Sequence, residues 1–171
     1  MPANQIRRAL DDLSSLLAEH PEKARGPNVP ATARLLEGLR CEANGPNGET
    51  VHTDMPALVG GAASAPSPGW LLRASLASCT ATTIAMRAAK LGIELTTLEV
   101  TVESSSDNRG MLGLDEKVSA GLSPITTRVK IGARNLAAGQ LRELAEWGDR
   151  HSPIACTTRS APSWSFEVEV V

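Results

Sequence analysis

The feature that most constrains this chain is the stretch from Pro68 to Arg87. Between Arg73 and Arg87 no side chain carries a charge at neutral pH apart from the ionisable thiol of Cys79, and Ala, Ser and Thr supply most of the residues. Ser67 is suited to cap a helix that starts at Pro68, and Gly92 stands where a left-handed residue ends one. A bilayer span needs about 20 mainly apolar residues, which this hydroxyl-rich run does not provide. We therefore predict the central helix of a soluble core, buried on most of its circumference.

Composition narrows the class of protein. A chain of 171 residues suits one domain, and a net charge of −2 with scattered basic residues argues against a nucleic-acid partner. With no Tyr and one Phe, the core must be aliphatic and Ala-rich. Three widely spaced cysteines and no recognisable signal peptide favour a cytoplasmic location, where cysteines are structural, metal-binding or reactive.

The segment before the central helix divides into three parts. Residues 4–19 have apolar side chains at helical spacing, which predicts an amphipathic arm that packs on the domain or across a dimer. Residues 21–30 resemble a linker, so we expect residues 1–30 to be an arm and residues 31–171 to be the domain. Residues 31–51 suit two strands joined by a turn at 44–48.

After the central helix, strands alternate with short helices. We predict a strand at 93–104, a polar loop at 104–116, and one or two strands within 118–133, of which 126–131 is the clearest. A helix at 137–150 and a short helical turn at Pro153 follow. A last strand at 163–171 is expected to pair with the sheet through Trp164 and its alternating apolar neighbours. This order predicts an α+β fold with an antiparallel sheet.

The Pro-x-x-Leu-Leu-x-Ala-Ser-Leu-Ala-Ser-Cys-Thr pattern of residues 68–80 resembles the peroxidatic-cysteine helix of the OsmC/Ohr family of thiol peroxidases. The Met-Pro-Ala-Leu-Val-Gly-Gly lead-in at 55–61 and the Ser-Ala-Pro-Ser-Pro run at 64–68 are also similar to that family. Further matches are the strand at 98–103, an Asp-x-Arg-Gly loop that begins at Asp107, and a late Ser-Pro-Ile helix start. Together these segments extend the resemblance over about residues 31–171.

The resemblance implies a fold and an activity. The fold is an antiparallel sheet wrapped around a long central helix, in an intertwined homodimer with two sites at the subunit interface. The activity is thiol-dependent reduction of organic hydroperoxides, a defence against oxidative stress, with an external and often lipoyl-based dithiol as reductant. No cofactor, metal, membrane or nucleic acid is implied.

Cys79 would be the peroxidatic thiol. A reactive thiol needs surroundings that favour the thiolate. Cys79 lies about three turns into the predicted helix, where the helix dipole helps little, so the cation must come from elsewhere. The family uses an arginine from the N-terminal hairpin, which corresponds to Arg40 here, with Arg34 and Arg128 as alternatives. The apolar part of a peroxide would contact a wall for which the candidates are Trp70, Leu71, Met55 and Leu58.

The chain departs from the family pattern in two places. Where members with well-formed sites have a glutamate shortly after the proline that opens the helix, this chain has Gly69 and Trp70, so Asp54 or Asp107 would have to orient the arginine. Where the family has Cys-Pro at the start of the late helix, this chain has Ser152 and Pro153.

Cys156 is therefore the candidate for the resolving thiol. It lies four residues after Ser152, one turn further along if the segment is helical. The alternative is a structural or free thiol.

Other constellations are weaker. Cys41 follows Arg40 in a predicted strand and is expected to pack. The three histidines and three cysteines lack the spacing of metal ligands, so we expect no metal site.

The alternative function is that of a non-catalytic small-molecule-binding protein, which kept the fold and lost the interacting arginine, glutamate and cysteine of the family's site.

Overall fold

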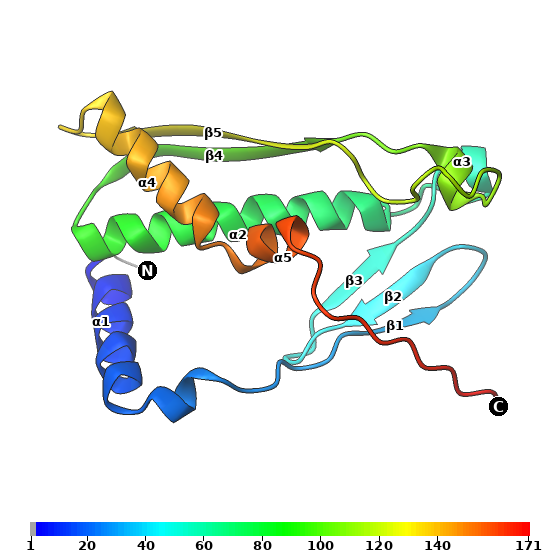
Figure 1. The fold of residues 1–171 in the computed structure, drawn as a ribbon, viewed down its shortest axis with the longest axis horizontal. Coiled ribbons are helices and arrows are strands. Elements are labelled where there is room, and N and C mark those ends of the chain that lie inside the picture. The colour runs from blue at the N-terminus through cyan, green and yellow to red at the C-terminus, as the bar shows by residue number, and fades with distance from the viewer. Residues whose placement is uncertain (1–2) are drawn as a thin grey trace. The chain divides into compact units, whose positions relative to one another are not determined.

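The computed structural model describes residues 3–171, so the first two residues of the predicted arm lie outside the described part (Figure 1). The chain forms two compact units. We call residues 76–101 and 128–171, with the start of the chain up to Arg7, the core unit. Residues 8–75 and 102–127 form the hairpin unit. No helix within residues 3–171 combines the length and the apolar character needed to cross a membrane.

The elements follow the predicted order with a few additions, but without the predicted last strand. The helices are α1 (Ala3–Glu19), α2 (Pro68–Leu91), α3 (Asn108–Met111), α4 (Ala138–Arg150) and α5 (Pro153–Arg159), with 3-10 turns η1 (Pro21–Ala24) and η2 (Ala57–Val59). The strands are β1 (Thr32–Leu35), β2 (Cys41–Asn44), β3 (Thr50–Thr53), β4 (Leu95–Ser104) and β5 (Ile125–Ala133). The turn η1 lies inside the predicted linker, and α3 lies inside the predicted polar loop.

The predicted central helix is confirmed as α2, the longest helix in Figure 1. The Ser67 Oγ atom accepts a hydrogen bond from the backbone N–H of Trp70 at 3.3 Å, which satisfies one of the free donors of the first turn. Gly92 ends the helix with φ of +72°, a conformation that favours glycine. Both ends of this helix are therefore set by residues next to it in the sequence.

The core unit packs α2 and α4 against strand residues. Ile84 and Ala88 of α2 and Leu144 of α4 are buried together. The partly buried residues that pack against them are Ile93, Leu95, Leu98, Val100, Val129, Ile131 and Ala145. The two helices approach closely at Gly148, where an added Cβ would lie 2.2 Å from the Cγ1 atom of Ile84. The buried apolar residues are all Leu, Ile or Ala among the described residues, as expected of an aliphatic, Ala-rich core.

The hairpin unit contains a three-stranded antiparallel sheet in the order β1-β2-β3. The prediction of two strands within residues 31–51 was therefore wrong. Gly38, with φ of +59°, turns the chain between β1 and β2, and the predicted turn at 44–48 joins β2 to β3. In the observed register Leu35 lies opposite Cys41, and Cys41 lies opposite Thr53.

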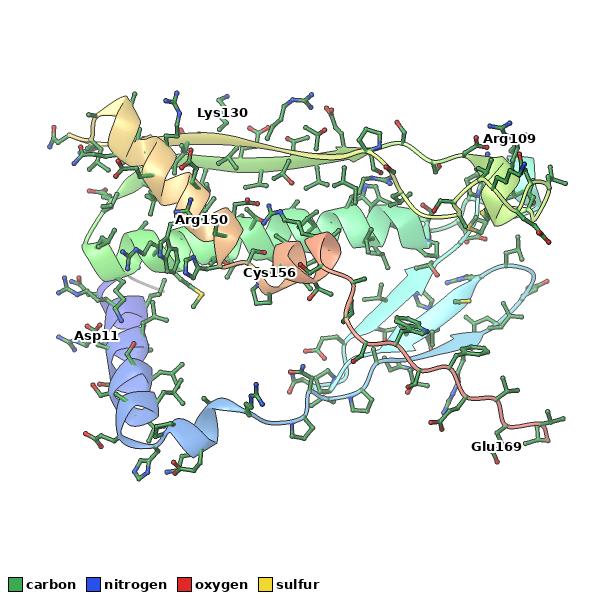
Figure 2. All side chains as sticks on the ribbon, in the orientation of Figure 1. Asp11, Arg109, Lys130, Arg150, Cys156 and Glu169 are labelled. Atoms are coloured by element: carbon green, nitrogen blue, oxygen red, sulfur yellow. The ribbon has the colours of Figure 1, made fainter. Side chains whose placement is uncertain are left out.

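The predicted last strand is not a strand in this chain. Residues 163–171 have no assigned secondary structure, and their apolar side chains stay exposed, Val168 least of all at 70%. Figure 2 labels Glu169 within this segment. An alternating pattern forms a strand only where a neighbouring strand completes its backbone hydrogen bonds. Within residues 3–171, no strand pairs with this segment.

Candidate functional site

Cys79 lies beside the buried stripe of α2. The stripe consists of Leu76, Thr80, Ile84 and Ala88, which repeat every four residues and so share one face of the helix. Cys79 is half-buried and keeps a free thiol, and its backbone carbonyl accepts a hydrogen bond from the Thr83 hydroxyl at 2.8 Å. Within the described part of the core unit, the Cys79 thiol itself makes no hydrogen bond. Cys79 is therefore placed at the edge of the core with an unengaged sulfur.

The start of α5 is anchored on the residue that follows Cys79. The Thr80 hydroxyl donates to the Ser152 Oγ atom at 3.4 Å, and both side chains are fully buried. The Ser152 Oγ atom also accepts a hydrogen bond from the backbone N–H of Ala155, so Ser152 caps α5, with Pro153 at the first helical position. Sequence reasoning recognised the Ser-Pro helix start but not the pairing with Thr80, because the two residues are 72 positions apart.

Cys156 lies on the exposed side of α5, as labelled in Figure 2. The predicted helical turn is confirmed as α5, and Cys156 is a free thiol. Its Sγ atom donates to the backbone carbonyl of Arg150, at the end of α4, at 3.2 Å. The structure thus places Cys79 and Cys156 in one unit as two reduced thiols.

The last residues of α4 and α5 are joined by an ion pair. Asp149 accepts from the Arg159 side chain through Oδ2, and Arg159 also donates to the Asp149 carbonyl oxygen at 3.4 Å. The ion pair fixes the C-terminal end of α5, as Ser152 fixes its beginning. The two contacts hold the segment that carries Cys156 against α4.

Arg40 belongs to the hairpin unit and lies in the turn between β1 and β2. Its backbone closes that turn, since the Leu36 N–H donates to the Arg40 carbonyl at 2.8 Å and the Arg40 N–H donates to the Glu37 carbonyl at 3.0 Å. The Arg40 side chain is exposed and has no ion pair or hydrogen bond among the described residues of this unit. Of the alternatives, Arg34 lies opposite Glu42 in the β1–β2 register, and Arg128 lies on β5.

The two carboxylates suggested as partners for Arg40 have hydrogen-bond partners of their own, and a pairing with Arg40 stays a prediction. Asp54 is buried at 2% exposure, and its four acceptor contacts all come from the loop that follows it. Asp107 caps α3 and pairs with Arg109, whose side-chain hydrogen bond is the main cause that lowers the pKa of Asp107 to about 2. Among the described residues, the contacts of these two carboxylates come from Arg109 and from the loop after Asp54.

Asp54 organises the loop that leads to α2. Its Oδ2 atom accepts from the backbone N–H groups of Ser64 and Ala62 at 3.0 and 3.2 Å and from the Ser64 hydroxyl at 2.8 Å, while Oδ1 accepts from the Met55 N–H at 2.7 Å. The bonds from Ser64 are the main cause that lowers the pKa of Asp54. A single carboxylate therefore closes a loop of about ten residues.

We expect Asp54→Asn to lower the melting temperature, because an amide cannot accept all four bonds. A carboxyl with a lowered pKa in the folded state stabilises the protein above its unfolded pKa of about 3.9, and this contribution is lost as the pH falls through the folded value. The melting temperature of the wild type should consequently fall more steeply between about pH 5 and pH 3 than that of Asp54→Asn. Scanning calorimetry at several pH values measures both, and parallel pH profiles would contradict this role.

The four residues predicted to form an apolar substrate wall all lie in the hairpin unit. Leu58 is 87% exposed and Trp70 is 49% exposed, while Met55 and Leu71 are half-buried. Two grooves in the core unit are lined by other residues. The wall therefore stays a prediction. Cys41 is a half-buried free thiol on β2, as expected of a packed residue.

Comparison with known proteins places the fold. The structure of an OsmC-like protein from Mycoplasma pneumoniae is similar, with a TM-score of 0.67 and 20% identity over 80% of this chain and 91% of that one. An organic hydroperoxide resistance protein OsmC from Legionella pneumophila has a TM-score of 0.57 and 20% identity, over 78% of this chain and 92% of that one. OhrB, the organic hydroperoxide resistance protein of Bacillus subtilis, has a TM-score of 0.51 and 19% identity, over 78% of this chain and 93% of that one. At these identities the likeness shows the fold.

The sequence itself identifies the family. No curated protein matches the chain. A model of the OsmC-like protein family, however, matches residues 61–167, which is more than half of the 171 residues and includes α2, Cys79 and α5. The expected α+β fold with antiparallel sheets is confirmed. The chain belongs to the OsmC-like protein family.

Proposed function

We propose that this protein reduces organic hydroperoxides with Cys79 as the attacking thiol. The observation that carries the proposal is the half-buried free thiol of Cys79 on α2, which makes no hydrogen bond among the described residues. Cys79 lies in an otherwise uncharged stretch of the helix, within the residues that match the family model. Two solved structures with the same fold are those of organic hydroperoxide resistance proteins. A role in hydroperoxide resistance agrees with this family assignment.

The chemistry proceeds in balanced steps. The Cys79 thiolate attacks the distal oxygen of the hydroperoxide, the O–O bond breaks, and the alkoxide takes a proton and leaves as an alcohol. Cys79 is then a sulfenic acid. A second thiol attacks its sulfur, water leaves, and a disulfide forms. An external dithiol, of which a lipoyl group is one example, returns the disulfide to two thiols while it is itself oxidised.

The remaining parts of the site belong to the same proposal. Arg40 supplies the cation that favours the thiolate, with Arg34 and Arg128 as the alternatives. Met55, Leu58, Trp70 and Leu71 contact the alkyl group of the peroxide. The functional form is a cytoplasmic homodimer with two sites at the subunit interface. The exposed apolar residues 164–170 support an assembly larger than one chain, because a second copy would remove them from water.

Cys156 is proposed as the resolving thiol. After one equivalent of cumene hydroperoxide, we expect the reduced wild type to lose two of its three thiols and to form a disulfide between Cys79 and Cys156. Cys156→Ser should instead keep a sulfenic acid on Cys79, which dimedone traps, because the second nucleophile is missing. Thiol counting and intact mass measure both results. A persistent added oxygen on wild-type Cys79 would mean that an external thiol, not Cys156, resolves the intermediate.

A second candidate function is a small-molecule-binding protein without catalysis. The observation that favours it is the engagement of Asp54 and Asp107 with their own loops, through partners other than Arg40. If cumene hydroperoxide oxidises no thiol within minutes at neutral pH, that result would support this candidate and contradict the proposed peroxidase activity.

A further inference from the structure

A groove in the core unit lies between the C-terminal turns of α2 and one face of α4. We call it the α4 groove; its volume is about 530 Å³, within the usual range for small-molecule sites. It is lined by Arg87, Leu91, Ile93, Leu136, Gln140, Glu143, Leu144, Trp147 and Arg150. The α4 members repeat at intervals of three and four residues, so they share one side of the helix. None of them is a residue of the proposed peroxide site.

The groove combines an apolar wall with two guanidinium groups. The Cζ atom of Arg87 lies 4.6 Å from the centroid of the Trp147 ring, and His151 stacks on the same ring at 4.0 Å. A guanidinium has five N–H donors, so a cation–π contact with one ring does not use up its capacity to donate hydrogen bonds. Among residues 3–171, Arg87 has no carboxylate partner. Arg87 is therefore a positioned cation without a counter-ion.

Arg150 is the second cation of the groove, and Figure 2 labels it in the last turn of α4. Its ion pair with Glu146 is long, at 3.8 Å, and both side chains are more than half exposed. Such a pair contributes little and is easily exchanged for another anion. The charged residues of the lining, Arg87, Arg150 and Glu143, sum to one net positive charge, and Glu146, which pairs with Arg150, lies outside the lining. The apolar lining residues Leu91, Ile93, Leu136 and Leu144 offer no charge to a ligand.

We propose that the α4 groove binds an amphipathic carboxylate, an acid with an aliphatic or aromatic body. Arg87 and Arg150 hold the carboxylate by charge-assisted hydrogen bonds, for which arginine has matching geometry. The apolar body packs against Ile93 and the leucine side chains of the lining. This binding does not depend on Cys79, and it goes beyond the proposed peroxide reduction.

Sodium decanoate is the probe, titrated below its micelle concentration and followed by calorimetry. We expect saturable binding to the wild-type protein and at least about tenfold weaker binding to Arg87→Gln, the effect of losing a charge-assisted hydrogen bond. Decanol and decyltrimethylammonium have the same chain length without the negative charge and should bind much more weakly. Equal affinity of the wild type for all three probes would overturn the proposal.

Arg142→Gln is the matched control. Arg142 lies on the same helix but lines the second groove, with Val129, Ile131 and Leu141, so its loss should change decanoate affinity by less than about twofold. Arg150→Gln removes an exposed side chain and tests the same cation pair if Arg87→Gln folds poorly. Unchanged decanoate affinity in Arg150→Gln and Arg87→Gln would contradict the site. A changed oligomeric state with unchanged affinity would identify the groove as a protein interface instead.

Discussion

Cys79→Ser is expected to lower the rate of cumene hydroperoxide reduction by at least about three orders of magnitude. A serine hydroxyl is not ionised at neutral pH and is a poor nucleophile without an activating base, whereas a thiolate attacks peroxide oxygen directly. Ser and Cys are similar in size, so the half-buried position beside the Thr80–Ser152 contact should tolerate the change. Peroxide consumption with a dithiol reductant in excess measures the rate.

Cys41→Ser provides the control for this result. Cys41 is also a half-buried free thiol, but it lies on β2 in the hairpin unit, so its loss should leave most of the rate. The same assay on Cys156→Ser separates attack from resolution, because only the steps after sulfenic acid formation need a second thiol. If Cys79→Ser kept more than about a tenth of the wild-type rate, another group would have to perform the attack.

The second large effect is expected from Gly148→Ala in α4. An added Cβ would lie 2.2 Å from the Cγ1 atom of Ile84 and 3.0 Å from the Ile84 Cα and N atoms. Because two of these three atoms belong to the α2 backbone, a rotamer change of Ile84 alone cannot make room. We expect a loss of about 3 kcal/mol in the free energy of unfolding, at the upper end of overpacking effects in a core. Urea denaturation followed by circular dichroism measures it.

Gly139→Ala in the same helix is the matched control. An added Cβ there meets nothing within 4 Å, so only the better helix propensity of alanine acts. That change should raise the free energy of unfolding by about 0.5–1 kcal/mol. Similar effects of the two substitutions would show that the α2–α4 contact at Gly148 does not limit stability.

Much of the fold follows from signals that act between neighbours. Ser67, Pro68 and Gly92 mark the ends of α2 because capping and the left-handed terminus involve only adjacent backbone groups. The Ser-Pro start of α5 was readable for the same reason. The additional turn at Gly38 was missed because the short segment around it gives a weak local signal, and α3 was missed because a helix of four residues has no periodicity.

The sequence by itself determined the central helix, the position of Cys79 on it and the family to which the chain is similar. Only the tertiary structure decided that Thr80 pairs with Ser152, that Asp54 closes its own loop, and that Arg87 stands over Trp147. It also decided that residues 163–171 have no partner strand within residues 3–171. Caps and periodicity operate within a few residues along the chain, whereas these contacts depend on how distant elements pack, which no local pattern specifies.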